Sequence, residues 1–462
     1  MEGGTILDVV VVGGGLAGLT AARVLAKVGR SVALFEASER VGGRTLNRSL
    51  PDGSVVEGGG EWVGPTQDRV LALARELGVG TYPTYDEGAR ILHYRGRRRL
   101  YRGKAPPLGV LALLDFAQAR FRMDRLAREL PIARPWEHPD AARYDSMSLE
   151  AWLRRVVRTA GARFLFDSLT LLSCGCTPRD ISLLFFLSYV RSGGGVEMLE
   201  SVDGGALSWR LAGGSQVLSI RMAAELGPRV RLHSPVRRLV RRSGHVEVVF
   251  DGGSVQAREV IVAVDPAIGR QIEIEPRPVL RDLLCRRWST AQAYKINVVY
   301  ETPFWRKAGL CGQVVSDAGA ARAVLDNGTP GSSLGVLVTF TGYPLAEPTL
   351  FSDERQDDRR AAVLSALATY FGPEAAAPID YLEQSWAASP WTGGCVPFPP
   401  TGLLSGYGPA LVEPVGSIHW AGTETADVWK GHMDGAIRSG ERAAEEVLRG
   451  LPDPTGGPRR PD

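Results

Sequence analysis

Cysteine, lysine and long hydrophobic runs are all scarce in this chain. Its five cysteines among 462 residues do not make a disulfide framework, and Cys174-Gly-Cys176 lacks the matching second pair of a zinc site, so we expect no bound metal. No apolar run approaches the length of about 18 residues that a membrane span needs. The apolar run 6–12 is too short for the core of a signal peptide. The sequence therefore predicts a cytoplasmic protein.

A marked excess of charge of either sign is also missing. Lys and Arg total 54 against 51 Asp and Glu, which gives a net charge of +3. This balance argues against binding to nucleic acid or to a membrane surface through electrostatics. With 44% hydrophobic residues, the chain is long enough for more than one hydrophobic core, and a homodimer remains open.

The first informative motif lies near the N-terminus. A β-branched run, 8–12, leads into Gly13-Gly14-Gly15-Leu16-Ala17-Gly18, and a helical pattern and a second strand pattern, 32–35, follow. In such a unit the glycines permit a tight turn, let the backbone approach a pyrophosphate and let the helix pack on the sheet. Glu36 closes the second strand, where a carboxylate can accept hydrogen bonds from the hydroxyls of an adenosine ribose. The unit predicts a bound dinucleotide.

A second glycine turn indicates which dinucleotide is bound. The segment Glu39-Arg40-Val41-Gly42-Gly43-Arg44-Thr45 supplies another close backbone approach and, at Arg44, a cation beside the same pyrophosphate. This arrangement resembles the FAD-binding pattern of the glutathione-reductase-like flavoproteins. FAD is therefore the expected cofactor.

Three further stretches resemble the flavin monoamine oxidases, and together they span nearly the whole chain. The loop GGGEWVGPTQ at 58–67 resembles that family's loop beside the flavin. The stretch 294–307 resembles the strand that carries its active-site lysine, and the stretch 419–444 resembles its C-terminal flavin signature. The resemblance implies an enzyme that oxidises the C–N bond of an amine to an imine and passes the electrons to O2, which forms H2O2.

The resemblance also implies the fold class. We expect an α/β protein with a discontinuous, glutathione-reductase-like FAD-binding domain of the Rossmann type and a mixed α+β substrate domain. Strand patterns are expected at 230–240, 246–250, 260–264 and 293–300. The FAD-binding domain is expected from 1–85, 210–285 and 385–452, the substrate domain from 86–209 and 286–384, and a flexible tail from 453–462.

One set of residues is placed around FAD by the resemblance. These residues lie in the glycine turns, in the loop 58–67, in the segment that ends at Cys395 and in the C-terminal signature. Val236 belongs to the set because it would meet the adenine. They are Gly13, Gly15, Leu16, Ala17, Gly18, Glu36, Ala37, Arg44, Gly59, Gly60, Glu61, Trp62, Val236, Trp391, Cys395, Gly422, Thr423, Glu424, His432 and Met433.

Lys295, Glu61 and His432 are the candidate catalytic residues. Lys295 lies in a half-buried strand pattern, and it is either an ion-paired strand lysine or, as the resemblance implies, the lysine that holds a water against flavin N5. Glu61 either accepts backbone hydrogen bonds or attracts an ammonium group and removes a proton from a substrate nitrogen. His432 stands where a helix is expected to begin, and it is either structural or part of the site beside the flavin.

Cys395 ends the segment Trp391-Thr392-Gly393-Gly394-Cys395. This segment matches the one through which mitochondrial members of the family attach their cysteine to the 8α-methyl of FAD. Only two residues separate Cys395 from Phe398-Pro399-Pro400, so the loop is shorter than in the family. The glycines favour a close approach of the chain to the ring, whereas Pro397 restricts the backbone. Covalent and non-covalent binding of FAD both remain open.

The substrate pocket is where the sequence departs from the family. The family's two facing aromatic rings are replaced by Val396 and His432, and its polar pocket residue and aromatic gate by Ala206 and Ala323. Because each change removes a ring or shortens a side chain, we expect a bulky amine or amide from biosynthesis, whose oxidised C–N unit is hydrolysed or captured by cyclisation. The expected pocket residues are Leu172, Met198, Leu199, Ala206, Ala323, Val396 and His432.

Two other function classes share these motifs. An L-amino acid oxidase has the same fold but needs a cation for the substrate carboxylate, and the many arginines of 86–209 keep that function open. A mutase or cyclase that holds FAD as a scaffold would show the dinucleotide motifs without net oxidation.

Overall fold

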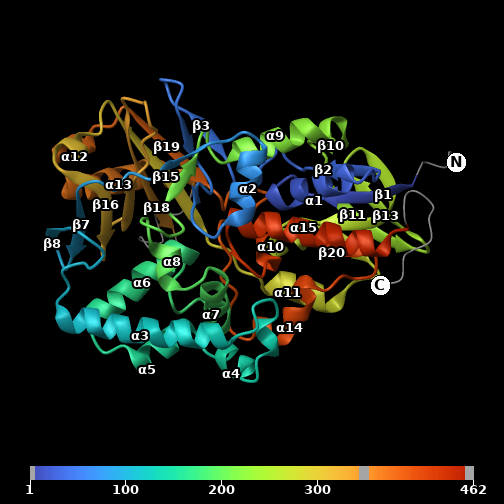
Figure 1. The fold of residues 1–462 in the computed structure, drawn as a ribbon, viewed down its shortest axis with the longest axis horizontal. Helices are drawn as coiled ribbons and strands as arrows, with labels where there is room; N and C mark the ends of the chain where they lie inside the picture. Colours follow the sequence, from blue (N-terminus) through green and yellow to red (C-terminus); the bar gives the residue numbers. More distant parts are fainter. Residues whose placement is uncertain (1–5, 343–352, 453–462) are drawn as a thin grey trace.

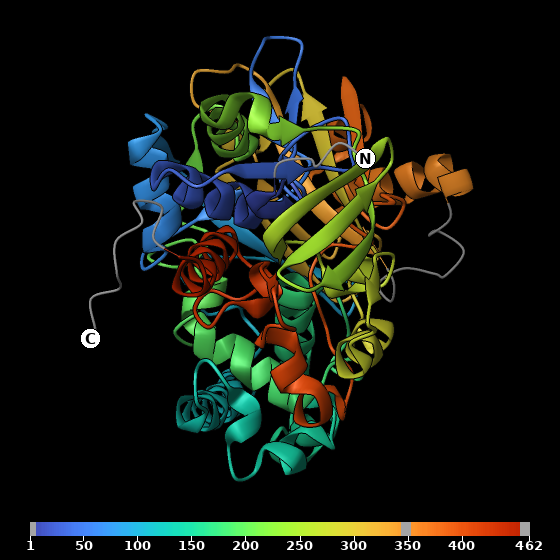
Figure 2. The same ribbon diagram turned by 90° about the vertical axis from the view of Figure 1, so that its right-hand side faces the viewer.

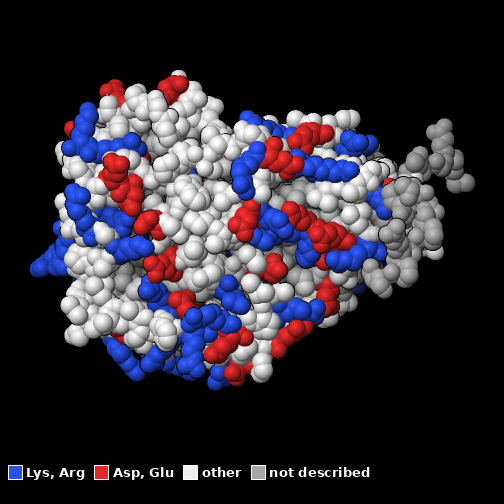
Figure 3. Space-filling view, in the orientation of Figure 1, with Lys and Arg blue, Asp and Glu red and all other residues white. Residues whose placement is uncertain are grey.

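Two large β-sheets and a layer of helices make up the computed structural model, which describes residues 6–342 and 353–452. The predicted tail, 453–462, lies outside the described residues. Figure 1 places one sheet at each end of the long axis, with the helical layer beneath the left-hand sheet. Figure 2 shows the same helices at the lower end of the molecule. Acidic and basic side chains are intermixed over the face drawn in Figure 3.

The eight-stranded sheet is built around the N-terminal strand β1. Its order is β10-β2-β1-β13-β12-β11-β14, and β20 pairs with β13. β1 is fully buried from Val9 to Val12, because helices cover one face of the sheet and apolar side chains cover the other. The strands are β1 (Leu7–Val12), β2 (Val32–Phe35), β10 (Val230–Arg231), β11 (Val236–Arg242), β12 (His245–Phe250), β13 (Gly253–Val262), β14 (Glu273–Glu275) and β20 (Ile418–Trp420).

Four helices cover one face of this sheet. They are α1 (Leu16–Lys27), α2 (Asp68–Glu76), α9 (Gln216–Leu226) and α15 (Met433–Gly450). α1 and α15 contact the strands of the sheet, α9 packs on α1, and α2 packs on α15. The strand-turn-helix-strand unit predicted at the N-terminus is confirmed as β1, α1 and β2. The helix predicted to begin at 432 or 433 is also confirmed, because α15 begins at Met433 with His432 as its N-cap.

The single strand predicted over 230–240 is wrong. Two strands replace it, and they lie on different sides of the sheet: β10 pairs with β2, whereas β11 pairs with β12 and β14. The chain turns between them at His233, whose φ is +51°. Pro235, which has no N–H to donate to a neighbouring strand, directly precedes β11.

The seven-stranded sheet has the order β19-β15-β18-β17-β16-β7-β8. The predicted strand 293–300 is confirmed as β15, which lies between β18 and β19 and is buried from Tyr294 to Tyr300. α13 (Gln356–Phe371) packs on one face. The strands are β7 (Ala89–Tyr94), β8 (Arg97–Tyr101), β15 (Ala293–Tyr300), β16 (Leu310–Ser316), β17 (Ala323–Asp326), β18 (Gly335–Gly342) and β19 (Asp380–Ser385).

A small third sheet lies close to both large sheets. In it β9 (Trp209–Leu211) pairs with β5 (Trp62–Val63) and with β6 (Thr81–Pro83). This pairing fixes the predicted loop 58–67, because Trp62 lies opposite Arg210 in the ladder. β3 (Asn47–Ser49) and β4 (Val55–Glu57) form a hairpin just before that loop.

The helical layer has its own hydrophobic core, which includes Phe185, Phe186 and Tyr189 from α7. In the part of the chain that the structure describes, no helix is both long and apolar enough to cross a bilayer. The helices that contribute are α3 (Val110–Glu129), α4 (Ala141–Asp145), α5 (Leu149–Val156), α6 (Ala160–Cys174), α7 (Leu183–Ser192), α8 (Val196–Glu200), α11 (Val279–Arg287) and α14 (Leu403–Val412).

Candidate active site

A cavity of about 750 Å³ is lined by residues that follow strands of the eight-stranded sheet and by residues of the seven-stranded sheet, the small sheet and the helical layer. One part of its wall comes from the β1–α1 turn and the segment 36–45. Another part comes from Trp62, from α7 and α8, and from β16 to β18. The segments 389–396 and 422–436 supply the remaining wall. A single cavity therefore joins the predicted dinucleotide site to the predicted substrate pocket.

The dinucleotide end has the backbone cradle that the glycine motif predicts. No heavy atom lies within 4 Å of where a Cβ on Gly15 would stand, so the backbone there faces open space. A Cβ on Gly18 would lie 2.0 Å from the carbonyl oxygen of Gly13, so only glycine fits this helix-to-turn contact. The Glu36 carboxylate accepts from Gly14 N–H at 2.5 Å and from Ser38 N–H at 2.8 Å, which fixes it at the cavity wall. These features fit the adenosine and pyrophosphate of FAD.

Arg44 connects the second glycine turn to two distant parts of the chain. Its guanidinium donates to the carbonyl oxygen of Cys395 at 2.8 Å and to Glu424 Oε1 at 2.6 Å, and it lies 3.5 Å from Asp265 Oδ2. Burial raises the pKa of Asp265 to about 8, with the nearby Glu424 charge acting in the same direction. Glu424 Oε2 is buried and has no hydrogen-bond partner among the described residues. Arg44, Asp265 and Glu424 therefore form one charged cluster, and all three residues line the cavity.

Lys295 enters the site from the middle of β15. Its Nζ donates to the carbonyl oxygen of Gly59 at 2.7 Å and lies 2.9 Å from Glu61 Oε2. The ammonium also lies 5.3 Å from the ring centre of Trp62 and 5.8 Å from that of Phe340, the residue opposite Lys295 on β18. Glu61 lines the cavity, and its Oε1 has no hydrogen-bond partner within the described ranges. A buried ammonium–carboxylate pair therefore lies beside the cavity, and Glu61 belongs to the cavity lining.

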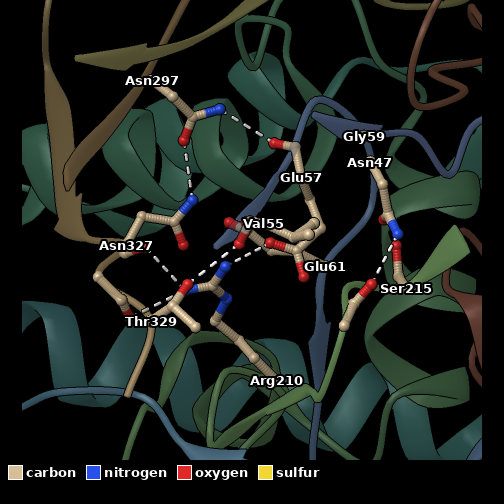
Figure 4. A network of polar contacts seen from close by, with 12 residues as sticks. Asn47, Val55, Glu57, Gly59, Glu61, Arg210, Ser215, Asn297, Asn327 and Thr329 are labelled. Carbon is tan, nitrogen blue, oxygen red and sulfur yellow. Dashed lines mark hydrogen bonds and ion pairs between the residues drawn. The ribbon is translucent and has the colours of Figure 1, made fainter. Parts of the chain in front are cut away.

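A second buried ion pair lies behind the first. Glu57 and Arg210 are paired and excluded from solvent, and Arg210 also donates to the carbonyl oxygen of Asn327 at 2.9 Å (Figure 4). Asn297 donates to the backbone oxygen of Glu57 at 3.0 Å and accepts from Asn327 at 2.8 Å. Burial raises the pKa of Glu57 to about 6, although Arg210 opposes that shift. The formal charges of the two pairs cancel, which reduces the cost of placing each of them away from water.

His432 faces the cavity from the N-cap of α15. Its ring is stacked at 5.8 Å on Tyr189 of α7, with an interplanar angle of 20°, and meets Trp429 edge-on at 4.9 Å. Burial lowers its pKa, so the imidazole is uncharged at neutral pH. Nδ1 lies 3.0 Å from the carbonyl oxygen of Lys430, which assigns the proton to Nδ1 and leaves Nε2 as an acceptor. Val396 lies near Tyr189, because a Cβ on Gly431 would contact both side chains.

Cys395 is held at the cavity wall by its backbone. Its N–H donates to the carbonyl oxygen of Ala291 at 2.9 Å, and its own carbonyl oxygen accepts from Arg44. Gly394, with φ of +146°, is the residue this path requires, since a Cβ there would lie 2.4 Å from Thr290 Oγ1. Burial raises the pKa of the thiol, while the charges of Arg44 and Lys295 oppose that rise. The sulfur thus lies within electrostatic range of both the dinucleotide end and the Lys295–Glu61 pair.

The sequence model of the flavin-containing amine oxidoreductases matches residues 16–448. The chain belongs to this family. It is 41% identical over 443 residues to AofH of Mycobacterium tuberculosis, a protein assigned to the flavin-containing monoamine oxidases, with 96% of each chain covered. It is also 35% identical over 459 residues to bovine flavin-containing amine oxidase A, and this alignment covers 97% of this chain and 86% of the bovine protein.

Solved structures of amine oxidases have the same fold. A putrescine oxidase bound to putrescine superposes with a TM-score of 0.91 at 34% identity, covering 96% of this chain and 99% of the other. Cyclohexylamine oxidase from Brevibacterium oxydans superposes with a TM-score of 0.89 at 29% identity, with the same coverage. The expected α/β fold with a Rossmann-type FAD-binding domain and a mixed substrate domain is confirmed. As a flavin-containing amine oxidase, the enzyme uses FAD and oxidises amines.

Most residues predicted for the site of this amine oxidase line the one cavity. Those that do are Gly13, Gly15, Leu16, Ala17, Glu36, Ala37, Arg44, Gly60, Glu61, Trp62, Leu172, Leu199, Ala206, Ala323, Trp391, Cys395, Val396, Gly422, Thr423, Glu424, His432 and Met433. Among the predicted residues outside the lining, Gly18 and Gly59 pack against backbone, and Lys295 contacts the lining residue Glu61. Met198 packs on the helical core, and Val236 lies in the sheet core while its neighbour His233 lines the cavity.

Several lining residues of the amine oxidase were not predicted from its sequence. Among them are Tyr189, Glu200, Asp265, Gln313 and Phe340. Tyr189 lies in a helix whose other residues are mostly apolar, so the sequence indicates only a core position for it. Phe340 could have been found by pairing the lysine strand with its neighbour, because it lies opposite Lys295.

Proposed function

We propose that this enzyme oxidises an amine bulkier than a simple arylalkylamine to an imine, with O2 reduced to H2O2. The observation that carries the proposal is that Val396, Ala206 and Ala323 all line the same cavity as Glu61. At each of these places the family resemblance implies a ring or a longer polar side chain. The volume freed by these small residues is available to the part of the substrate that is not oxidised.

FAD, when bound, supplies the acceptor for the hydride equivalent that leaves the substrate α-carbon. We assign its adenosine and pyrophosphate to the cradle of Gly15, Glu36 and Arg44. We propose two domains on the basis of the two large sheets, with the FAD-binding domain at 1–85, 210–285 and 385–452 and the substrate domain at 86–209 and 286–384. The N-terminus of α15 presents unpaired backbone N–H groups that would stabilise negative charge developing on the cofactor.

Lys295 and Glu61 are proposed to handle the protons of the reaction. The free Oε1 of Glu61 is oriented by the Lys295 contact, and it is the group that would accept the proton a substrate nitrogen loses. The amine loses a hydride equivalent from carbon and a proton from nitrogen, and O2 takes up two electrons and two protons to give H2O2. The rings of Trp62 and Phe340 beside the ammonium exclude water from this pair.

His432 is assigned a substrate-orienting role in this proposal. Its uncharged ring, stacked on Tyr189, presents a flat surface and the acceptor Nε2 to the cavity. The imine is either hydrolysed by water to an aldehyde or captured by another group of the same substrate.

Cys395 is proposed to attach FAD covalently. Cys395 lines the cavity, and its backbone position is fixed by hydrogen bonds to the carbonyl oxygen of Ala291 and from the Arg44 guanidinium. Thioether formation would replace the thiol hydrogen with the 8α-carbon and release two electrons and two protons, which O2 accepts.

The charges of the cavity wall favour an amine over an α-amino acid. Among the described lining residues, the arginines are Arg40 and Arg44. Arg40 donates to three backbone carbonyl oxygens, and Arg44 is occupied by Glu424 and the Cys395 carbonyl oxygen. A substrate carboxylate would find no arginine in the described part of the pocket that is free to bind it.

The test is a peroxide and oxygen-consumption screen over arylalkylamines, bulky amines, amino acids and amides. We expect kcat/KM to be at least about 10-fold higher for the best bulky amine than for benzylamine, because extra apolar contact in a pocket is worth about 1–3 kcal/mol. Val396→Tyr should shift that preference towards benzylamine. Anaerobic addition of the active amine should bleach the flavin. Oxidation of amino acids alone, or no bleaching with any of these compounds, would contradict the proposal.

A further inference from the structure

The backbone just before Glu61 is held by side chains from distant segments. Four consecutive carbonyl oxygens, those of 57–60, each accept a hydrogen bond from a side chain. The donors are Asn297 for Glu57 at 3.0 Å, Trp386 for Gly58 at 2.9 Å, Lys295 for Gly59 at 2.7 Å and Ser215 for Gly60 at 2.5 Å. The position of Glu61 in the cavity lining is therefore set by tertiary contacts.

Two buried ion pairs meet at this segment. The first joins Lys295 Nζ to Glu61 Oε2 at 2.9 Å. The second joins the Arg210 guanidinium to Glu57. Each of the four residues is at most 3% exposed, and each cation also interacts electrostatically with the carboxylate of the other pair. Either cation is therefore close enough to neutralise either carboxylate.

The neighbours of Arg210 in the small sheet carry no charge. Trp62 lies opposite it on β5, and Tyr82 lies opposite it on β6. Burial raises the pKa of Tyr82 to about 12, so its phenol is neutral at pH 7. The balance of charge at this place therefore depends on the two cations and the two carboxylates.

A closed ring of hydrogen bonds commits Arg210 to Glu57. Arg210 donates to the carbonyl oxygen of Asn327 at 2.9 Å, and the Asn327 side chain donates to Asn297 Oδ1 at 2.8 Å. Asn297 donates in turn to the carbonyl oxygen of Glu57, which closes the ring (Figure 4). Asn297 lies two residues after Lys295, so both side chains leave the same face of β15. The ring fixes which cation meets Glu57, and it leaves Lys295 to the other carboxylate.

We propose that Arg210 is a positioning residue for the oxidation: by neutralising Glu57, it keeps the Lys295 ammonium paired with Glu61. This inference rests on the proposed function, because it takes Lys295 and Glu61 as the groups that handle the protons. Without Arg210, one ammonium would have to neutralise two buried carboxylates, whose attraction the surrounding protein screens only weakly. Lys295 would then move towards Glu57, and Glu61 would lose the contact that orients it.

Anaerobic stopped-flow measurement of flavin reduction in the holoenzyme, with the amine that the wild type oxidises best, tests this role. Arg210→Met should retain FAD but slow reduction by about 10-fold to 100-fold, as a small misplacement of reacting groups does. Glu57→Gln should slow it too, because the unpaired Arg210 then competes with Lys295 for Glu61. The two changes combined leave no unmatched charge and should recover most of the lost rate. Arg210→Lys, which retains the charge, should be slowed less than Arg210→Met.

Chemical denaturation gives a second readout that does not depend on turnover. Lys295→Met lowers the free energy of unfolding, because it leaves Glu61 buried without a partner. In the Glu57→Gln background the same change should lower it less, because Arg210 can then neutralise Glu61. The difference between the two backgrounds measures the coupling between the pairs. Equal losses in both backgrounds would show that the cations do not exchange partners, which would overturn the proposal.

Arg359→Met is the matched control. Arg359 of α13 forms a buried ion pair with Glu383 and lies 3.8 Å from the ring centre of Tyr294. Because Tyr294 and Lys295 are successive residues of β15, this pair lies on the opposite face of the sheet. The change should lower stability without slowing flavin reduction. A slowing as large as that of Arg210→Met would show that the loss of any buried ion pair disturbs the site.

The outcomes separate this inference from the function on which it rests. Wild-type rates of flavin reduction in both single variants would overturn the role of Arg210, as would a double variant as slow as Arg210→Met. If the single variants fail to fold, the double variant decides: a rate near that of the wild type supports the role, and slow reduction overturns it. In each of these cases the amine oxidase proposal stands. If no amine reduces the flavin of the wild type, the proposed function itself fails.

Discussion

The Lys295 ammonium lies 2.9 Å from Oε2 of Glu61, and both side chains are excluded from bulk solvent. The two residues are far apart in the sequence, and they meet because β15 brings one and the loop before β5 brings the other. Removing one member of a buried ion pair leaves an uncompensated charge, at a typical cost of about 3–5 kcal/mol. The pair is therefore a structural and a chemical unit.

Lys295→Met should retain FAD but slow flavin reduction or reoxidation by about 10-fold to 100-fold, because the charge beside the reacting atoms is lost while the dinucleotide cradle is unchanged. Stopped-flow measurement of both half-reactions checks this. The variant should also be less stable, because Glu61 is left buried without its partner.

Two further variants separate these effects. Lys295→Met combined with Glu61→Gln should recover much of the lost stability without recovering the rate. Lys307→Met removes a lysine from the exposed surface of α12 (Phe304–Lys307), and it should alter neither property. Unchanged rates of both half-reactions in Lys295→Met would show that the role of Lys295 is purely structural.

His432→Phe tests whether the imidazole transfers a proton. Burial lowers the pKa of His432, so the ring is uncharged at neutral pH and above, where it should contribute no ionisation to the pH dependence of kcat/KM. We expect the variant to keep the shape of the wild-type pH profile and to lose less than about 10-fold in rate, since the stack on Tyr189 remains. Loss of one limb of the profile would instead identify His432 as an acid–base catalyst.

Because Lys430 is buried, we expect the free energy of unfolding to depend on pH. Burial lowers its pKa from 10.5 to about 8 in the folded protein, so the unfolded chain binds more protons between these values and stability rises as pH increases from 8 to 10.5. Lys430→Met should raise the free energy of unfolding by roughly 1–3 kcal/mol below pH 8, and the gain should shrink towards pH 10.5. Chemical denaturation at a series of pH values measures it, with Lys307→Met as the exposed control. A gain that is the same at every pH would show that ionisation of Lys430 is not its cause.

Local sequence was sufficient for the parts of the molecule that form from neighbouring residues. The unit from β1 to β2 was predictable because its strand, turn and helix follow one another within 7–35. The position of Lys295 on a buried strand was predictable for the same reason, since the alternation of 293–300 is visible in the sequence itself.

Contacts between distant segments explain what could not be predicted. The 230–240 run divides because its halves pair with different strands, β2 and β12, and the sequence of the run does not encode those partners. The Glu57–Arg210 pair joins residues separated by 153 positions, and each residue alone reads as a surface charge. Glu200 was missed for a related reason, because a glutamate at the end of a short helix indicates solvent until the surrounding cavity is known.

Cys395 should form a covalent bond to FAD. Acid precipitation of the holoenzyme should leave the flavin on the protein, and a peptide containing Cys395 should carry the mass of FAD. The shortened loop does not withdraw the residue from the cavity, because Gly394 passes close to Thr290 and the Arg44 guanidinium holds the Cys395 carbonyl oxygen. Since the thiolate is the nucleophile and burial raises the pKa of this thiol, attachment of FAD to the apoprotein should become faster as pH rises.

Cys395→Ala should bind FAD without a bond, so that acid releases a yellow supernatant, and it should still oxidise amines. Cys311→Ala, which alters a buried thiol on β16 outside the cavity lining, should keep the flavin attached. Quantitative release of FAD from freshly denatured, fully loaded wild-type protein would show that no bond forms. In that event the charges of Arg44 and Lys295 do not lower the thiol pKa enough to make it reactive, and Cys395 is a small side chain that shapes the flavin site.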